Sequence, residues 1–140
     1  MRVTTLIALL LLAGYGRTDI SAEISRQAEI GDGSLDLSKL GGPTWDRVFF
    51  FGPYTTNANA EKALGFTCDV EKRTAIKFSD GINVLVFVAG CRVATYIEHP
   101  RRQDFWTLSG QCSPRSQAAL IQREGSFVRP TVEEHTASCH

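Results

Sequence analysis

Apolar residues gather in a few short runs along this chain, and the period of each run predicts a different element. The run RVFFF places Val48 and Phe50 on one side of an extended backbone and Phe49 and Phe51 on the other. Because both sides are apolar, we predict a strand that is covered on both faces. Gly52-Pro53 ends this strand, since proline has no N–H to donate to a sheet.

The next segment, TTNANAEKALGF, has the period of a helix. Ala60, Ala63 and Leu64 give it an apolar side, and Thr56 or Asn57 stands where a side chain can cap the first turn. Gly65 follows at the position where a left-handed residue commonly ends a helix. We therefore predict one compact helix over this segment.

The segments that follow alternate as β-strands do. Ala75–Ser79 and Ile82–Val88 flank Asp80-Gly81, and Asp-Gly is a strong hairpin signal because both central residues take positive φ. A second turn near Ala89-Gly90 returns the chain as Cys91–Glu98. Together these segments predict a three-stranded antiparallel meander.

The segment AALIQREGSFVRPTV predicts a last strand or hairpin that turns at Glu124-Gly125. The fold class is therefore α+β, with a mostly antiparallel sheet, a central three-stranded meander and one main helix packed on a face. We place this single domain at residues 45–132. Ahead of it we expect a polar tether over residues 17–44, with one helical turn and a short edge strand at Leu35–Leu37. Residues 133–140 form a polar tail.

The start of the chain reads as an export signal over residues 1–16. Arg2 supplies a basic charge, and Leu6–Ala13 form an apolar stretch that is too short for a bilayer, which takes about 20 apolar residues. LAGY is one residue away from the Leu-Ala-Gly-Cys box of bacterial lipoproteins, but lipid transfer needs a thiol and Tyr15 offers a phenol. We predict a protein exported to the periplasm or cell envelope, with membrane contact only through the signal or a lost lipid anchor.

Four cysteines lie beyond this signal, and an even number in an exported chain indicates disulfides. Three pairings are open. Cys139 lies in a polar tail that has little else to fix it, and a bridge to Cys112 would close a loop worth about 3 kcal/mol in the chain-entropy model. We favour that pairing slightly, which leaves Cys68 with Cys91.

Charge and motif content narrow the function. The chain has 15 basic and 15 acidic side chains, and its basic pair Arg101-Arg102 lies beside Glu98 and Asp104, so nothing favours nucleic-acid binding. It carries no Gly-x-Ser-x-Gly, no phosphate-binding glycine loop and no His-Glu-x-x-His. We predict no catalytic residue, no cofactor and no metal site.

His99 is the most interesting titratable group, because Glu98 and Asp104 are near enough in sequence to tune it. If the protein is an enzyme, these residues would have to carry out its catalysis. The interpretation we favour is a histidine at a strand end that is bonded to the backbone. The tail also gathers possible metal ligands, although we favour a disulfide-bonded tail there: Glu133, Glu134, His135, Cys139 and His140.

Aromatic residues are the remaining candidates. A domain this small needs several of them in its core, but part of the set could line a binding face instead; the set is Trp45, Phe49, Phe51, Tyr54, Phe105 and Trp106. Asp46 and Tyr54 would supply the polar groups of such a face. Our binding candidates are therefore Trp45, Asp46, Tyr54, His99, Arg101, Phe105 and Trp106.

The strings WDRVFFFGPYT, EKALGF, DGINVLVFV and YIEHPR occur in this order between residues 35 and 104. They resemble a group of small bacterial exported proteins and lipoproteins, which carry a Trp-Asp-x-Val-x-x-Phe-x-Pro-Tyr segment, a helix that ends in Leu-Gly-Phe and a hairpin that reaches a Pro-Arg. The resemblance implies export to the cell envelope and supports the predicted fold, and it implies no enzymatic reaction.

We therefore predict a disulfide-stabilised, non-enzymatic binding or accessory protein that contacts an envelope protein or a cell-wall component. Two alternatives stay open. One is an inhibitor or immunity-type protein against a periplasmic hydrolase or toxin, for which the Gln103–Ser116 connection is the first place to test. The other is a hydrolytic enzyme that uses His99.

Overall fold

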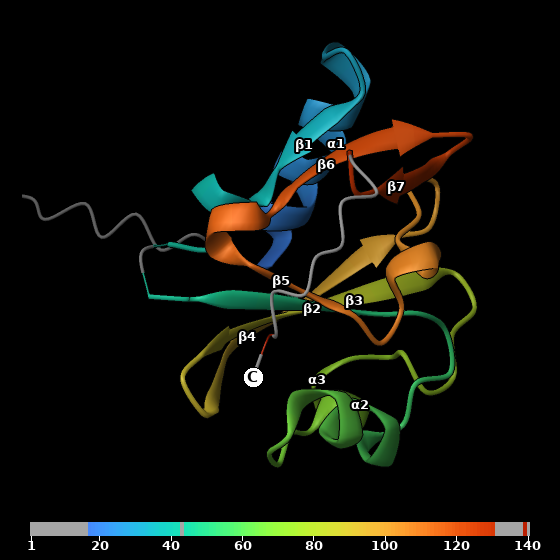
Figure 1. The fold of residues 1–140 in the computed structure, drawn as a ribbon. Coiled ribbons are helices and arrows are strands. Elements are labelled where there is room, and N and C mark those ends of the chain that lie inside the picture. The colour runs from blue at the N-terminus through green and yellow to red at the C-terminus, as the bar shows by residue number, and fades with distance from the viewer. Residues whose placement is uncertain (1–16, 43, 131–138, 140) are drawn as a thin grey trace, which may run out of the picture.

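The computed structural model describes residues 17–42, 44–130 and 139, which stack in three layers (Figure 1). The middle layer is an antiparallel sheet of order β4-β3-β2-β5. Helix α1 and a second sheet of order β1-β6-β7 cover one face, and α2 and α3 cover the other. The elements are α1 (Arg17–Ile30), β1 (Ser34–Asp36), β2 (Arg47–Phe51), α2 (Asn57–Leu64), α3 (Val70–Arg73), β3 (Ile82–Ala89), β4 (Arg92–Pro100), β5 (Cys112–Pro114), β6 (Ala119–Arg123) and β7 (Ser126–Val128).

Strand β2 confirms the prediction of a strand covered on both faces. Val48 and Phe50 pack into the core under α1 and the second sheet, and Phe49 and Phe51 pack into the core under α2 and α3. All four side chains are at most 2% exposed. The α+β class and the antiparallel sheet are confirmed as well.

Helix α2 forms as its sequence predicts. The Thr56 side chain accepts a hydrogen bond from the backbone N–H of Asn59, and Gly65 ends the helix with a φ of 82°. Ala60 and Leu64 are buried against the sheet. This short helix therefore has both of its predicted end signals and its apolar side in use.

The predicted strand at Ala75–Ser79 is wrong. These residues form a turn, in which the N–H of Phe78 donates to the carbonyl of Ala75 at 3.1 Å. β2 takes the predicted place beside β3, with pairs from Arg47↔Val88 to Phe51↔Val84. Its apolar residues fill both cores, which the residues of 75–79 could not do. The three-stranded centre of the sheet is thus β4-β3-β2, and the β3–β4 turn at Gly90 is confirmed.

The polar tether predicted for residues 17–44 is wrong as well. This stretch contains α1, in which Ile20 is 3% and Ile24 is 0% exposed, and Ala28 packs against the same core. Three small or branched apolar residues spaced four apart give a stripe that is narrow but sufficient for docking. The short strand expected near Leu35 is confirmed as β1, which pairs with β6.

The last hairpin is confirmed, since β6 and β7 pair around Glu124 and Gly125, whose φ angles are 51° and 81°. Residues 1–16 and 131–138, which include the predicted signal and most of the tail, lie outside the described residues. Within the described ranges, no helix is long and apolar enough to cross a membrane.

Candidate functional site

The predicted aromatic set divides into buried and exposed members. Trp45, Phe49, Phe51 and Phe105 are at most 2% exposed, as expected for core residues. Tyr54 and Trp106, in contrast, are 57% and 59% exposed. Only these last two aromatic rings of the set are available to a partner.

Phe78 joins them, with 82% of its surface exposed. Sequence reasoning missed this residue because it placed Phe78 inside the predicted strand Ala75–Ser79. The turn that contains it points the ring outward, and the Lys77 ammonium lies 5.6 Å from the ring centre. We call Tyr54, Phe78 and Trp106 the aromatic end.

The three loops of the aromatic end meet at one end of the four-stranded sheet, where β2 and β4 finish and β3 and β5 begin. The N–H of Tyr54 donates to the carbonyl of Ile76 at 2.8 Å, which joins the Tyr54 loop to the Phe78 loop. The N–H of Gly52 donates to the Ser109 hydroxyl at 3.0 Å, which joins it to the Trp106 loop. These contacts join the three loops that carry the exposed rings.

Asp104 fixes the position of Trp106. One carboxylate oxygen accepts hydrogen bonds from the Trp106 N–H at 3.0 Å and the Asn83 amide at 2.8 Å, and the other accepts from the Arg101 guanidinium at 2.8 Å. Burial alone would raise the pKa of Asp104, but these hydrogen bonds hold that pKa below its usual value. Arg101, a predicted site residue, also donates to the carbonyl of Asp80 and so supports the base of this end.

Tyr54 has a φ of 63°, a left-handed conformation that is uncommon for a residue with a Cβ. Such a conformation costs about 1 to 3 kcal/mol and persists where the surroundings impose it. Here the neighbouring Thr55 hydroxyl, which is buried, donates to the carbonyl of Gly52 at 2.7 Å. The loop therefore holds an exposed tyrosine in a strained backbone.

Trp45 and Asp46 do not belong to this site. They precede β2, whereas Tyr54 follows it, so they lie at the opposite end of the sheet. Asp46 accepts a hydrogen bond from the N–H of Gly90 at 2.7 Å, and the Trp45 ring is buried with the Arg115 guanidinium 4.6 Å from its centre. Both residues therefore stabilise the fold, and the expectation of one surface that joins them to Tyr54 is wrong.

His99 is fully buried and has no carboxylate partner among the described residues. Its Nε2 lies 3.1 Å from the Gln103 side-chain oxygen, so Nε2 carries the proton and Nδ1 accepts from the Ser21 hydroxyl at 2.8 Å. Burial lowers the pKa of His99 to about 4, and Arg102 contributes in the same direction. A neutral histidine that ties α1 to β4 is the result.

The carboxylates that an enzyme would need beside His99 are occupied elsewhere. Glu98 accepts a hydrogen bond from the N–H of Ala75, and Asp104 is bound to Arg101. Both contacts hold loops in place. The structure therefore does not bring together the three residues of the enzyme hypothesis.

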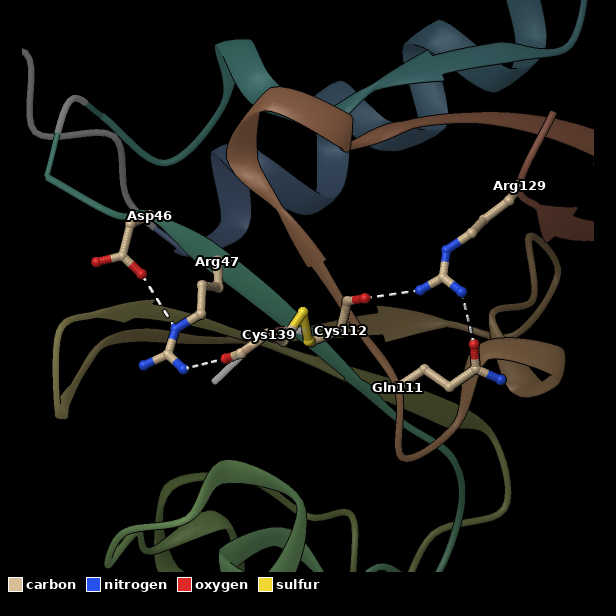
Figure 2. Close-up of a disulfide and its surroundings, with 6 residues drawn as sticks. All are labelled: Asp46, Arg47, Gln111, Cys112, Arg129 and Cys139. Atoms are coloured by element: carbon tan, nitrogen blue, oxygen red, sulfur yellow. Dashed lines mark hydrogen bonds and ion pairs between the residues drawn. A yellow bond between two sulfur atoms is a disulfide. The ribbon is translucent and has the colours of Figure 1, made fainter. Parts of the chain in front are cut away.

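A disulfide joins Cys112 to Cys139, as we favoured, with 6.3 Å between their Cα atoms (Figure 2). The carbonyl of Cys139 accepts from Arg47 at 2.6 Å, and the carbonyl of Cys112 accepts from Arg129 at 2.6 Å. The predicted bridge between Cys68 and Cys91 is wrong, since both are free thiols. Cys91 is exposed in the β3–β4 turn, whereas Cys68 is half-buried beside α3.

Possible metal ligands in the tail, other than Cys139, lie outside the described residues. Among the residues that are described, no three His, Cys, Asp or Glu side chains gather closely enough to hold a metal ion. Comparison with protein-family models, curated proteins and solved structures finds no match to this chain.

Proposed function

We propose that this chain is an exported, non-enzymatic protein of the cell envelope that binds another envelope protein through its aromatic end. The observation that carries the proposal is the exposure of Tyr54, Phe78 and Trp106 on three connected loops. Tryptophan and tyrosine are enriched among the residues that dominate protein interfaces, and exposed aromatic clusters mark such interfaces. The Cys112–Cys139 disulfide is compatible with an oxidising compartment.

Site-specific photo-crosslinking tests this proposal. A photoreactive phenylalanine analogue at position 78 or 106 should give a discrete adduct with one envelope protein, since both positions lie within the contact. The control is the same analogue at Lys39, whose side chain is 81% exposed in another part of the fold. Equal adducts from all three positions, or adducts with cell-wall glycan only, would contradict the proposal. So would turnover of a cell-wall substrate that His99→Ala abolishes.

The strained backbone of Tyr54 allows binding to be separated from stability. Tyr54→Gly removes the ring and also relieves the positive φ, so partner binding should weaken at least tenfold while the free energy of unfolding changes by about 1 kcal/mol or less. Glu124→Gly is the matched control, because it relieves a φ of 51° without removing an aromatic ring. Its partner binding should equal that of the wild type.

A second candidate function is inhibition of a periplasmic hydrolase or toxin by the Gln103–Ser116 connection. The observation that favours it is Trp106, which is exposed within this connection and held by the Asp104 carboxylate. A fixed aromatic residue on a supported loop is suited to fill a pocket of a target enzyme. If this function holds, Asp104→Asn should weaken inhibition by loosening the loop, and an unchanged inhibition constant would contradict it.

A further inference from the structure

Strand β4 is an open edge of the four-stranded sheet. It is the first strand in the order β4-β3-β2-β5, and among the described residues no strand pairs with its outer side. The N–H of Arg101 donates to the carbonyl of Gly81, which fixes the alternation of the ladder. His99 and Ile97 therefore bond to β3, and the backbone groups of Tyr96 and Glu98 point away from the sheet.

Two features limit the part of this edge that can accept another strand. At one end the register shifts, since Phe87 faces Thr95 but Val88 faces Val93, so Ala94 is an inserted bulge residue. At the other end Pro100 has no N–H to offer. The regular stretch between them is 95–99, and its centre is Ile97.

A groove of about 750 Å³ runs beside this stretch, between α1 and the end of α3. Its lining includes Ala22 and Arg26 of α1, Tyr96 and Glu98 of β4, and Arg73 of α3. A strand added to β4 would occupy this groove. The edge is thus accessible as well as unpaired.

We propose that a second copy of this chain occupies the groove and pairs its own β4 antiparallel to the first, around a two-fold axis at Ile97. This axis places the whole regular stretch of one copy against that of the other. Tyr96 of each copy then faces Glu98 of the other, and the outward N–H and C=O groups of the two residues bond across the axis. Any other centre would bring the bulge or the proline into the pairing.

The side chains are complementary in the same arrangement. Arg73 has no ion-pair partner among the described residues, and it lines the groove next to Tyr96. One Glu98 oxygen accepts from the N–H of Ala75 in its own copy, and the other has no partner among the described residues. Because Tyr96 faces Glu98 of the second copy, that second oxygen falls beside Arg73, and the contact repeats by symmetry.

The pairing also ends at two copies. The other edge of the sheet, β5, has only three residues, and Arg129 already occupies the outward carbonyl of Cys112. A dimer through β4 therefore has no further edge of comparable length in the four-stranded sheet. This inference does not depend on which partner binds the aromatic end.

Light scattering coupled to size-exclusion chromatography of the purified chain tests the proposal. The wild type should have twice the mass of one chain at high concentration and dissociate on dilution. Glu98→Pro removes one outward N–H without removing a bond to β3, and it should raise the dimer dissociation constant at least about tenfold. Glu98→Ala keeps that N–H and, like the proline variant, loses the side chain that holds Ala75, so it is the matched control, with a smaller rise of a few-fold. A monomer at every concentration, or a dimer insensitive to Glu98→Pro, would overturn the proposal.

A charge exchange gives a second test in case the proline variant folds poorly. Arg73→Glu and Glu98→Arg should each weaken the dimer, because each places like charges together across the axis. The double variant restores opposite charges and should return the dissociation constant to within a few-fold of the wild type. Additive weakening in the double variant would show that these side chains do not meet, and the proposed register would be wrong.

Discussion

The two edges of the four-stranded sheet differ in length and in whether their outward backbone groups are covered. β5 is three residues long, and Pro114 lacks an N–H while the Arg129 guanidinium binds the carbonyl of Cys112. The disulfide brings Cys139 to the same edge (Figure 2). β4 is nine residues long, and its outward backbone groups border the groove between α1 and α3.

This difference indicates which edge of the sheet can pair with another chain. Exposed edges invite pairing with other chains, and proteins commonly cover, shorten or charge them. Here a disulfide and a half-buried arginine cover one edge, whereas the other keeps a regular stretch between a bulge and a proline. The comparison supports a dimer at β4 and no pairing at β5.

The largest effect should come from a variant that uncovers the β5 edge. Cys139→Ser leaves β5 intact but removes a bridge between residues 27 apart in sequence, which should lower the free energy of unfolding by about 3.5 kcal/mol. Urea unfolding without reductant measures this loss, and light scattering should detect species larger than a dimer. Cys91→Ser, at an exposed free thiol, is the control and should change neither. If Cys139→Ser matched the control, the disulfide would not protect the edge.

The next effect concerns the inner side of the open edge, where His99 ties β4 to α1. The pKa of His99 is about 4 in the folded state and near 6.5 when the chain is unfolded. The unfolded state therefore binds more protons between these pH values, so the free energy of unfolding should fall by about 3 kcal/mol as pH drops from 6.5 to 4. Unfolding curves of wild type and His99→Gln should show that only the wild type has this part of the pH dependence. Parallel curves would contradict the neutral, buried histidine.

A smaller effect should follow from uncovering a single backbone group of β5. Arg129→Met removes the hydrogen bonds to the carbonyl of Cys112 and to the Gln111 side chain and should cost about 1 to 2 kcal/mol. Arg123→Met, at an exposed position of β6, is the control and should be neutral within about 0.5 kcal/mol. Equal stability of the two variants in urea would show that Arg129 does not cover the edge.

Local signals explain how much of this fold the sequence could predict. The strand at Phe49 and Phe51, the helix that ends at Gly65 and the turn at Glu124-Gly125 each carry their own cues, and all are confirmed. The prediction of a strand at 75–79 is wrong because two segments compete for the place beside β3, and β2 fills both cores better. α1 was predicted only as a single helical turn, because Ile20 and Ile24 offer too narrow a stripe to identify a longer helix without the sheet they pack on.

The candidate site was harder to predict for the same reason. Sequence identifies which residues are aromatic, but the exposure of a ring depends on loops that are distant in the chain. Tyr54 and Trp106 were among the candidates, whereas Phe78 was not, because its turn was mistaken for a strand. The outward groups of β4 depend on its register with β3 and on the bulge at Ala94, which the hydrophobic pattern does not specify.

Backbone hydrogen exchange of β4 as a function of protein concentration tests the central contrast most directly. The N–H groups of Ile97 and His99 bond to β3, so they should exchange slowly at every concentration. Those of Tyr96 and Glu98 should exchange rapidly in dilute protein and slowly in concentrated protein, because a second copy covers them. If Tyr96 and Glu98 exchange at one rate across the whole concentration range, β4 is not the edge at which two copies of this chain meet.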